Sequence, residues 1–237
     1  MNNPLLNKTD NNLDIYISEE GISCIVSDEN QNVMIHQELN VSIHHKTDIH
    51  LIEAFFSQPE LDVLSDNVTI HVENSFYLLI PSELYRNEDI GLFFQTIFGK
   101  GGNETLQNMA IPKWSLHLTY RMPKKLITFF IDRFPEVEFE HIIFSLLKGF
   151  IQKHQQAVYL NIRKNEIDLG LTQNNKLQLL VSFPVKTNED ICYYVLNVFE
   201  QFHLSTERVA LKIKQKNGEN NPVVKLLKQY ITNVIKD

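Results

Sequence analysis

The stretch from Val158 to Ile213, VYLNIRKNEIDLGLTQNNKLQLLVSFPVKTNEDICYYVLNVFEQFHLSTERVALKI, decides the fold. Three of its segments alternate apolar and polar residues at the strand period, and polar turns separate them. These segments are 158–163, 167–171 and 176–183. A stripe of apolar residues at helical spacing follows, and residues 208–213 alternate again. The stretch therefore predicts three strands, one amphipathic helix and a fourth strand, which together form a βββαβ unit.

Residues 13–72 repeat the same order of elements. Short identities accompany the repeat, because Val-Ser followed by Lys-Thr ends the third strand in both copies. These residues are Val41, Ser42, Lys46 and Thr47 in the first copy and Val181, Ser182, Lys186 and Thr187 in the second. Each Thr is the expected N-cap of a helix, and Asp190 completes a near capping box with Thr187. Two unrelated βββαβ units remain an alternative, but the shared order and identities favour an internal duplication.

The remaining segments extend this pattern. We expect further strands at 76–80, 114–120 and 137–143, and helices at 89–98, 123–134 and 144–152. The Gly-rich run 99–105 predicts a flexible loop. Residues 222–236 have an apolar face at helical spacing and predict a C-terminal helix. The expected domains are an N-terminal half, 1–142, and a C-terminal half, 143–237.

The composition is that of a mildly acidic globular protein. Its 237 residues include 22 Lys and Arg against 29 Asp and Glu, which gives a net charge of −7. This balance argues against a nucleic-acid partner, although the C-terminal lysines leave RNA association as a weaker alternative. No apolar run approaches the roughly 20 residues that span a bilayer, so we expect no membrane insertion. We expect the two cysteines to be core residues rather than a disulfide, which fits a reducing cytoplasm. The N-terminus does not resemble a signal peptide, so we expect a cytoplasmic protein.

The duplicated pattern resembles the actin-like ATPase fold, also called the duplicated ribonuclease H-like fold, of the α/β class. Segment 114–143 looks like the corresponding part of the pilus-assembly and cell-division members of that superfamily. The whole chain is most similar to an uncharacterised bacterial family, domain of unknown function 3822. The residues that carry this resemblance are 76–85, 122–126, 161–180 and 187–194. The resemblance implies two βββαβ-containing halves with mixed sheets flanked by helices.

The resemblance also implies that ATP would bind in a cleft between the halves, on an Asp-x-Gly turn after the first strand of each copy. The first turn is Ser18-Glu19-Glu20-Gly21, which keeps a glycine but whose two carboxylates would repel phosphate. The second turn, 163–166, has neither Gly nor Asp, although its cations could meet an anion. The candidate nucleotide-binding residues are therefore Gly21, Arg163 and Lys164.

One string imitates the phosphate motif in the wrong place. Asp168-Leu169-Gly170 lies on the expected second strand rather than on the turn, so we expect Asp168 to face solvent. The loop 99–105 also lacks the spacing of a P-loop. Neither string predicts a phosphate site.

Other chemistry has little support in the sequence. A ribonuclease H-like nuclease would need several carboxylates around two metal ions. The candidates on the expected strands are Asp14 and Glu38. The nearest histidines are His44, His45 and His50, but adjacent strand residues point to opposite faces. No motif for a Ser or Cys nucleophile occurs. We therefore predict no catalytic residue and no metal site.

The function is not encoded by any motif. We expect a non-catalytic binding or scaffold protein on a degenerate actin-like frame, with a protein partner and no cofactor. The alternative is a divergent nucleotide-binding ATPase or kinase-like protein that uses ATP with magnesium in the inter-domain cleft. Whether the chain is an enzyme stays open, with the eroded turns arguing against it.

Overall fold

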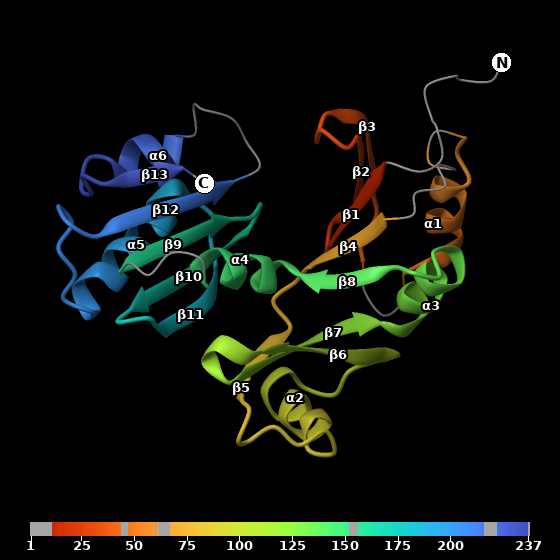
Figure 1. The fold of residues 1–237 in the computed structure, drawn as a ribbon, viewed down its shortest axis with the longest axis horizontal. Helices are drawn as coiled ribbons and strands as arrows, with labels where there is room; N and C mark the ends of the chain where they lie inside the picture. The colour runs from red at the N-terminus through yellow and green to blue at the C-terminus, as the bar shows by residue number, and fades with distance from the viewer. Residues whose placement is uncertain are drawn as a thin grey trace. The chain divides into compact units, whose positions relative to one another are not determined.

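A computed structural model describes residues 11–43, 47–59, 61, 67–151, 156–215 and 222–236 (Figure 1). The chain divides into two compact units, Met1–Ser145 and Leu146–Asp237. The dividing point lies in helix α4 (Ile142–Ile151), which also contains the boundary expected from the sequence.

The first unit is built on a five-stranded sheet with the order β3-β2-β1-β4-β8. Its elements are β1 (Asn12–Ser18), β2 (Gly21–Ser27), β3 (Val33–Asn40), α1 (Ile49–Phe56), β4 (Asn67–Glu73) and β8 (Glu138–His141). Strands β1, β2 and β3 are antiparallel neighbours, whereas β4 runs parallel to β1. Alternate residues of β1 are buried, as the strand period requires. They join α1 and α3 (Lys124–Arg133) in one hydrophobic core.

The second unit repeats this topology. Its sheet has the order β11-β10-β9-β12-β13, and β9 pairs antiparallel with β10 and parallel with β12. The elements are β9 (Ala157–Ile162), β10 (Glu166–Gln173), β11 (Lys176–Pro184), α5 (Asn188–Gln201), β12 (Ala210–Gln215), α6 (Pro222–Leu227) and β13 (Val234–Lys236). Helices α5 and α6 pack on one core with the sheet. The matching strand order confirms the predicted duplication.

A three-stranded sheet with the order β5-β7-β6 extends the first unit. Its elements are β5 (Tyr77–Pro81), α2 (Ile90–Phe98), β6 (Glu104–Ile111) and β7 (Leu116–Pro123), with a short 3-10 turn, Pro112–Trp114, before β7. Helix α2 covers one face of this sheet through Ile90 and Phe94 (Figure 1). Tyr120 and Met122 of β7 belong to the core that contains α3.

Strand β6 is missing from the sequence prediction. Glu104 and Thr105, which we assigned to a flexible loop, are its first residues. Only Ile111 of this strand is buried, because β6 lies at the edge of its sheet. An edge strand with polar residues on both faces lacks the alternation that would reveal it.

The helix caps agree with the sequence in the second copy and differ in the first. Thr187 and Asp190 form the predicted capping box at the start of α5. At α1 the N-cap is Asp48, whose side chain accepts a hydrogen bond from the backbone N–H of His50 at 3.0 Å. The predicted cap, Thr47, instead donates to the carbonyl of Ser42.

The predicted C-terminal helix 222–236 is wrong in its second half. Helix α6 ends at Leu227, and Val234–Lys236 pairs with β12 as strand β13. The turn between them buries Ile231, and the N–H of Leu211 donates to the carbonyl of Asn233. Apolar residues that suit a helical face therefore serve one short helix, one turn and one strand. No helix in the described ranges has the length and apolar content to cross a membrane.

Candidate functional site

The first turn of the N-terminal copy joins β1 to β2 and presents two exposed carboxylates, Glu19 and Glu20. Gly21 follows them at the start of β2. A Cβ atom on Gly21 would lie 2.2 Å from the carbonyl oxygen of Leu39 in β3, well inside van der Waals contact. The close approach of β3 thus accounts for this glycine without any phosphate.

A cavity of about 420 Å³ lies beside this turn, wholly within the first unit. Four carboxylate side chains and one cation line it, namely Glu19, Glu20, Glu73, Glu104 and Arg121. The other lining residues are Ile17, Ser18, Ser42, Ile43, Val72, Asn74, Phe76, Met122, Pro123 and Leu126. An excess of negative charge disfavours a phosphate group at this place.

Arg121 is held on one wall of the cavity. Its Nε lies 3.3 Å from Oε2 of Glu104, and its Nη2 donates to the carbonyl of Gly99 at 3.2 Å. The guanidinium also lies over the rings of Phe76 and Phe94. These contacts fix the cation in a structural role.

The polar face of the first sheet carries an Asp–His pair. Nε2 of His71 in β4 lies 2.8 Å from Oδ1 of Asp14, and the ring of Tyr16 stacks on His71. Burial, followed by the charges of Asp14 and Glu73, raises the pKa of Tyr16. Glu73, the smallest of these contributions, also lines the cavity.

The carboxylates of a nuclease do not come together here. Glu38 of β3 pairs with His36, and strand β2 separates β3 from the strand that carries Asp14. Among the residues that the structure describes, no three His, Cys, Asp or Glu side chains could hold a metal ion. His50 pairs with Glu53 on α1, whereas His44 and His45 lie outside the described residues.

The first turn of the C-terminal copy is organised around Asp168. The guanidinium of Arg163 donates from Nη2 to Oδ1 at 2.9 Å and from Nε to Oδ2 at 3.1 Å. Arg163 also pairs with Glu166 on the same turn, and its side chain is only 8% exposed. The cation is therefore occupied within the second unit.

The expectation that Asp168 faces solvent is wrong. Instead of facing solvent, its side chain is fully buried. Asn161 and Ser182, its cross-strand neighbours in β9 and β11, donate to it at 2.8 Å and 2.6 Å. A buried carboxylate with these donors is a structural centre of the sheet.

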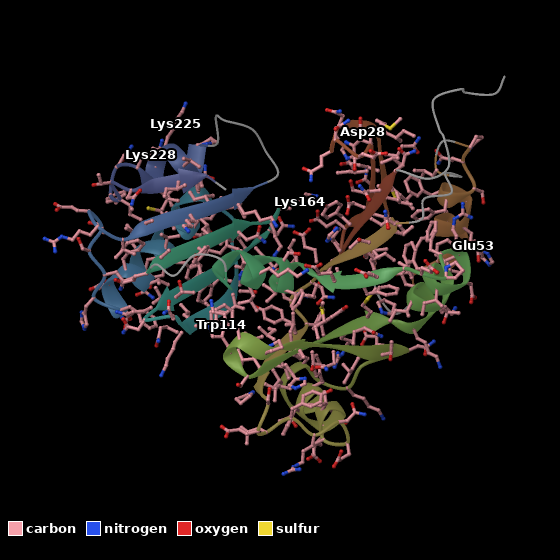
Figure 2. All side chains as sticks on the ribbon, viewed as in Figure 1. Asp28, Glu53, Trp114, Lys164, Lys225 and Lys228 are labelled. Carbon is pink, nitrogen blue, oxygen red and sulfur yellow. The ribbon has the colours of Figure 1, made fainter. Side chains whose placement is uncertain are left out.

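Of the three predicted nucleotide-binding residues, Lys164 is the one with an exposed side chain (Figure 2). Gly21 is explained by the packing of β3, and Arg163 is tied to Asp168 and Glu166. The side chains at the two turns thus do not match the phosphate ligands that the fold implies. The assignment of all three residues to a nucleotide stays a prediction.

The C-terminal lysines whose side chains the structure describes do not all lie on one exposed face. Lys212 is buried, with its Nζ 5.1 Å from the centroid of the Tyr159 ring. Lys225 and Lys228 lie exposed on and just after α6 (Figure 2), and Lys216 is outside the described residues. These positions do not outline a nucleic-acid surface.

Neither cysteine is placed for nucleophilic chemistry. Cys24 and Cys192 are both free and buried. Burial raises the pKa of the Cys24 thiol to about 12. Burial, with a smaller contribution from Glu189, also raises the pKa of Cys192. Both thiols therefore stay protonated near neutral pH.

Helix α2 presents an apolar surface that the sequence analysis missed. The helix contains no charged residue. Ile90 and Phe94 face its own sheet, whereas Leu92 is 63% exposed, Ile97 is 59% exposed and Phe93 is 40% exposed. The available signal was the presence of apolar residues on every side of a short helix, which is the pattern of a helix buried all round. We call Leu92, Phe93 and Ile97 the α2 face.

The fold agrees with comparisons to known proteins. The model of the family described as protein of unknown function (DUF3822) matches residues 2–234, so the chain belongs to this family. No curated protein matches the chain.

Solved structures of other proteins share the fold, among them three that cover most of this chain. One is a Bacteroides thetaiotaomicron protein with an actin-like ATPase fold and unknown function, 22% identical over 97% of this chain and 91% of that chain, with a TM-score of 0.76. The PilM–PilN type IV pilus biogenesis complex is 9% identical over 95% and 88% of the chains, with a TM-score of 0.57. The ethanolamine utilization protein EutJ from Carboxydothermus hydrogenoformans is 9% identical over 99% and 86%, with a TM-score of 0.50.

Proposed function

We propose that this chain is a non-catalytic binding or scaffold protein, in which the actin-like ATPase fold serves as a frame for a protein partner. The observation that carries the proposal is the exposed α2 face, Leu92, Phe93 and Ile97. Large apolar side chains that are exposed on a helix lose water favourably when a complementary protein surface covers them.

The side chains at the two first turns support the non-catalytic part of the proposal. Glu19 and Glu20 place negative charge where the fold would place phosphate, and Arg163 already neutralises Asp168. A protein that binds partners needs neither turn for phosphoryl transfer. We therefore propose no resident cofactor, with ATP and magnesium as the alternative.

The partner is proposed to be a protein rather than nucleic acid or lipid. A similar structure, PilM–PilN, is itself a complex of two proteins. We also propose a cytoplasmic location, because Cys24 and Cys192 are free thiols and free thiols persist under reducing conditions.

The test is capture of partners from the native host with the full chain as bait. Leu92→Glu combined with Ile97→Glu should remove the dominant partner, because charges on the α2 face would have to be desolvated on binding. Ile131→Glu is the matched control, since Ile131 is a comparably exposed residue on α3. An unchanged partner set with the double variant, or metal-dependent ATP hydrolysis by the purified chain, would contradict the proposal.

A further inference from the structure

Strand β3 forms an outer edge of the five-stranded sheet in the first unit (Figure 1). Strand β2 is its neighbour on one side, and among the residues that the structure describes no strand pairs with its other side. The side chains of His36 and Glu38 on β3 are 51% and 61% exposed. The edge of a sheet presents backbone N–H and C=O groups that can pair with another strand.

The sequence of β3, VMIHQELN, lacks the residues that usually keep a sheet edge from pairing. It contains neither lysine nor proline, both of which discourage contact between edges. In the second copy the edge strand β11 begins at Lys176 and ends at Pro184. A β-bulge shifts the register of β3 only at its Val33 end. The rest of β3 is therefore a regular edge strand without these protective residues.

The ladder with β2 determines which backbone groups of β3 point outward. The N–H of Val41 donates to the carbonyl of Glu20 at 3.2 Å, and the same register continues along both strands. Hydrogen-bonded and non-hydrogen-bonded pairs alternate in an antiparallel ladder, so the odd-numbered residues of β3 bond to β2. The N–H and C=O groups of His36, Glu38 and Asn40 therefore point away from β2.

A second copy of β3 can pair antiparallel about a two-fold axis only if outward groups lie opposite outward groups. Near the middle of the strand, this condition permits an axis at residue 36, 37 or 38. An axis at His36 or Glu38 sets that residue against its own copy, which is unfavourable when the two groups carry the same charge. An axis at Gln37 sets His36 against Glu38 of the second copy, at two symmetric positions.

The register about Gln37 is complementary on both faces of the strand. On one face, His36 lies 3.3 Å from Glu38 of its own chain, and each imidazole would also meet the carboxylate of the second copy. On the other face, Ile35 would lie opposite Leu39, and both already pack against the core of the first unit. Cross-strand pairs of opposite charge and of apolar side chains both stabilise sheets.

We propose that β3 pairs with β3 of a second copy of this chain, antiparallel about Gln37, so that two first units share one continuous sheet. Each β3 would cover the edge of the other, so the contact closes on itself and gives a dimer rather than a filament. The proposal does not depend on the α2 face, because α2 covers a different sheet.

The test is sedimentation velocity of the full chain over a range of concentrations. We expect a monomer–dimer equilibrium with a dissociation constant in the micromolar range. His36→Glu should weaken dimerisation about tenfold, because it sets carboxylates against each other at both symmetric positions. His36→Glu combined with Glu38→His restores the complementarity and should dimerise as the wild type does. His50→Glu is the matched control, since it removes an exposed His–Glu pair on α1.

Amide hydrogen exchange measured by NMR tests the register separately. The amides of His36 and Glu38 point outward in the monomer, so they should exchange more slowly at high chain concentration than at low concentration. The amide of Gln37 already bonds to β2 and should change little. Thermal unfolding of each variant checks that its fold is retained.

A chain that stays monomeric at about 1 mM would overturn the proposal. A dimer that tolerates His36→Glu would overturn it too, as would amides of His36 and Glu38 whose exchange does not depend on concentration. If Leu92→Glu combined with Ile97→Glu disperses the dimer and His36→Glu does not, the contact lies at the α2 face and the assignment to β3 is wrong.

Discussion

The two copies of the βββαβ unit have the same strand order, but their first turns differ in which charged side chains they carry and in whether these are exposed or buried. The N-terminal turn carries two exposed carboxylates beside a cavity, and β3 packs against Gly21. The C-terminal turn folds its cation inward, where Arg163 pairs with Asp168. The difference teaches that the cores of the sheets maintain the fold while the turns can change. The residues of both turns differ from the Asp-x-Gly pattern that the fold implies.

The largest difference in stability between the two copies is expected at the buried ion pair of Arg163 and Asp168. Asp168→Ala should lower the free energy of unfolding by about 3–5 kcal/mol, because Arg163 would stay buried without its main partner. A contrasting change in the first copy, Asp14→Ala in β1, removes a partly exposed pair with His71 and should cost about 1 kcal/mol or less. Urea unfolding of both variants measures the contrast.

A double variant controls for the loss of the side chain itself. Asp168→Leu combined with Arg163→Met should recover only part of the stability lost in Asp168→Ala, since it removes the unpaired charge but leaves the donors of Asn161 and Ser182 without their acceptor. Equal stability of Asp168→Ala and the wild type would show that the buried pair does not organise the second turn.

The glycine of the first turn gives the next largest effect. Gly21→Ala should destabilise the chain by about 1–3 kcal/mol, because its Cβ would press on the carbonyl of Leu39. Gly91 of α2 has open space where a Cβ atom would lie, so Gly91→Ala is the control and should stabilise by up to about 1 kcal/mol. The measurement is again urea unfolding. If Gly21→Ala leaves the free energy of unfolding unchanged, the packing of β3 does not explain this glycine, and a role in ligand binding would be favoured.

The helix caps of the two copies should also differ in how much they stabilise the chain. Thr187→Ala removes one half of the capping box on α5 and should cost about 1 kcal/mol. Asp48→Ala removes the single cap of α1 and should cost no more than that, because no reciprocal bond accompanies it. Thermal unfolding of the two variants checks the order, and a larger loss from Asp48→Ala would contradict it.

The smallest effect is the pH dependence of the α5 cap. Backbone hydrogen bonds from Lys186 and then Thr187 lower the pKa of Asp190 in the folded chain. Its contribution to stability is therefore present above the usual Asp pKa of about 3.9 and is lost as the pH falls through the lowered folded value. The difference in unfolding midpoint between wild type and Asp190→Asn should shrink below that pH. A constant difference from neutral to acidic pH would rule out this linkage.

The duplicated fold could be predicted from the sequence because strand alternation and the apolar stripe of α5 report directly on burial. Strand β6 could not, since an edge strand buries too little to impose a pattern. The apolar residues of 222–236 suggested one long helix, but Ile231 is buried in a turn rather than on a helix. Local periodicity identifies which residues are buried more reliably than the element that buries them.

The candidate sites were less accessible to sequence reasoning. The identity of the two turns was predicted, but the burial of Asp168 depends on its register with Asn161 and Ser182. The cavity and the α2 face depend on how β7 and α2 pack in the first unit. Such tertiary choices bring together residues far apart in the chain, and no local motif records them.

The most direct test of the central claim is thermal unfolding of the full chain with Mg-ATP or Mg-ADP. A ligand at 100 times its dissociation constant stabilises the native state by about 2.7 kcal/mol, so binding at millimolar nucleotide would be visible. If neither turn holds phosphate, the unfolding midpoint will not change at any nucleotide concentration. A midpoint that rises with nucleotide concentration, and that Lys164→Ala returns to the value without nucleotide, would contradict the account.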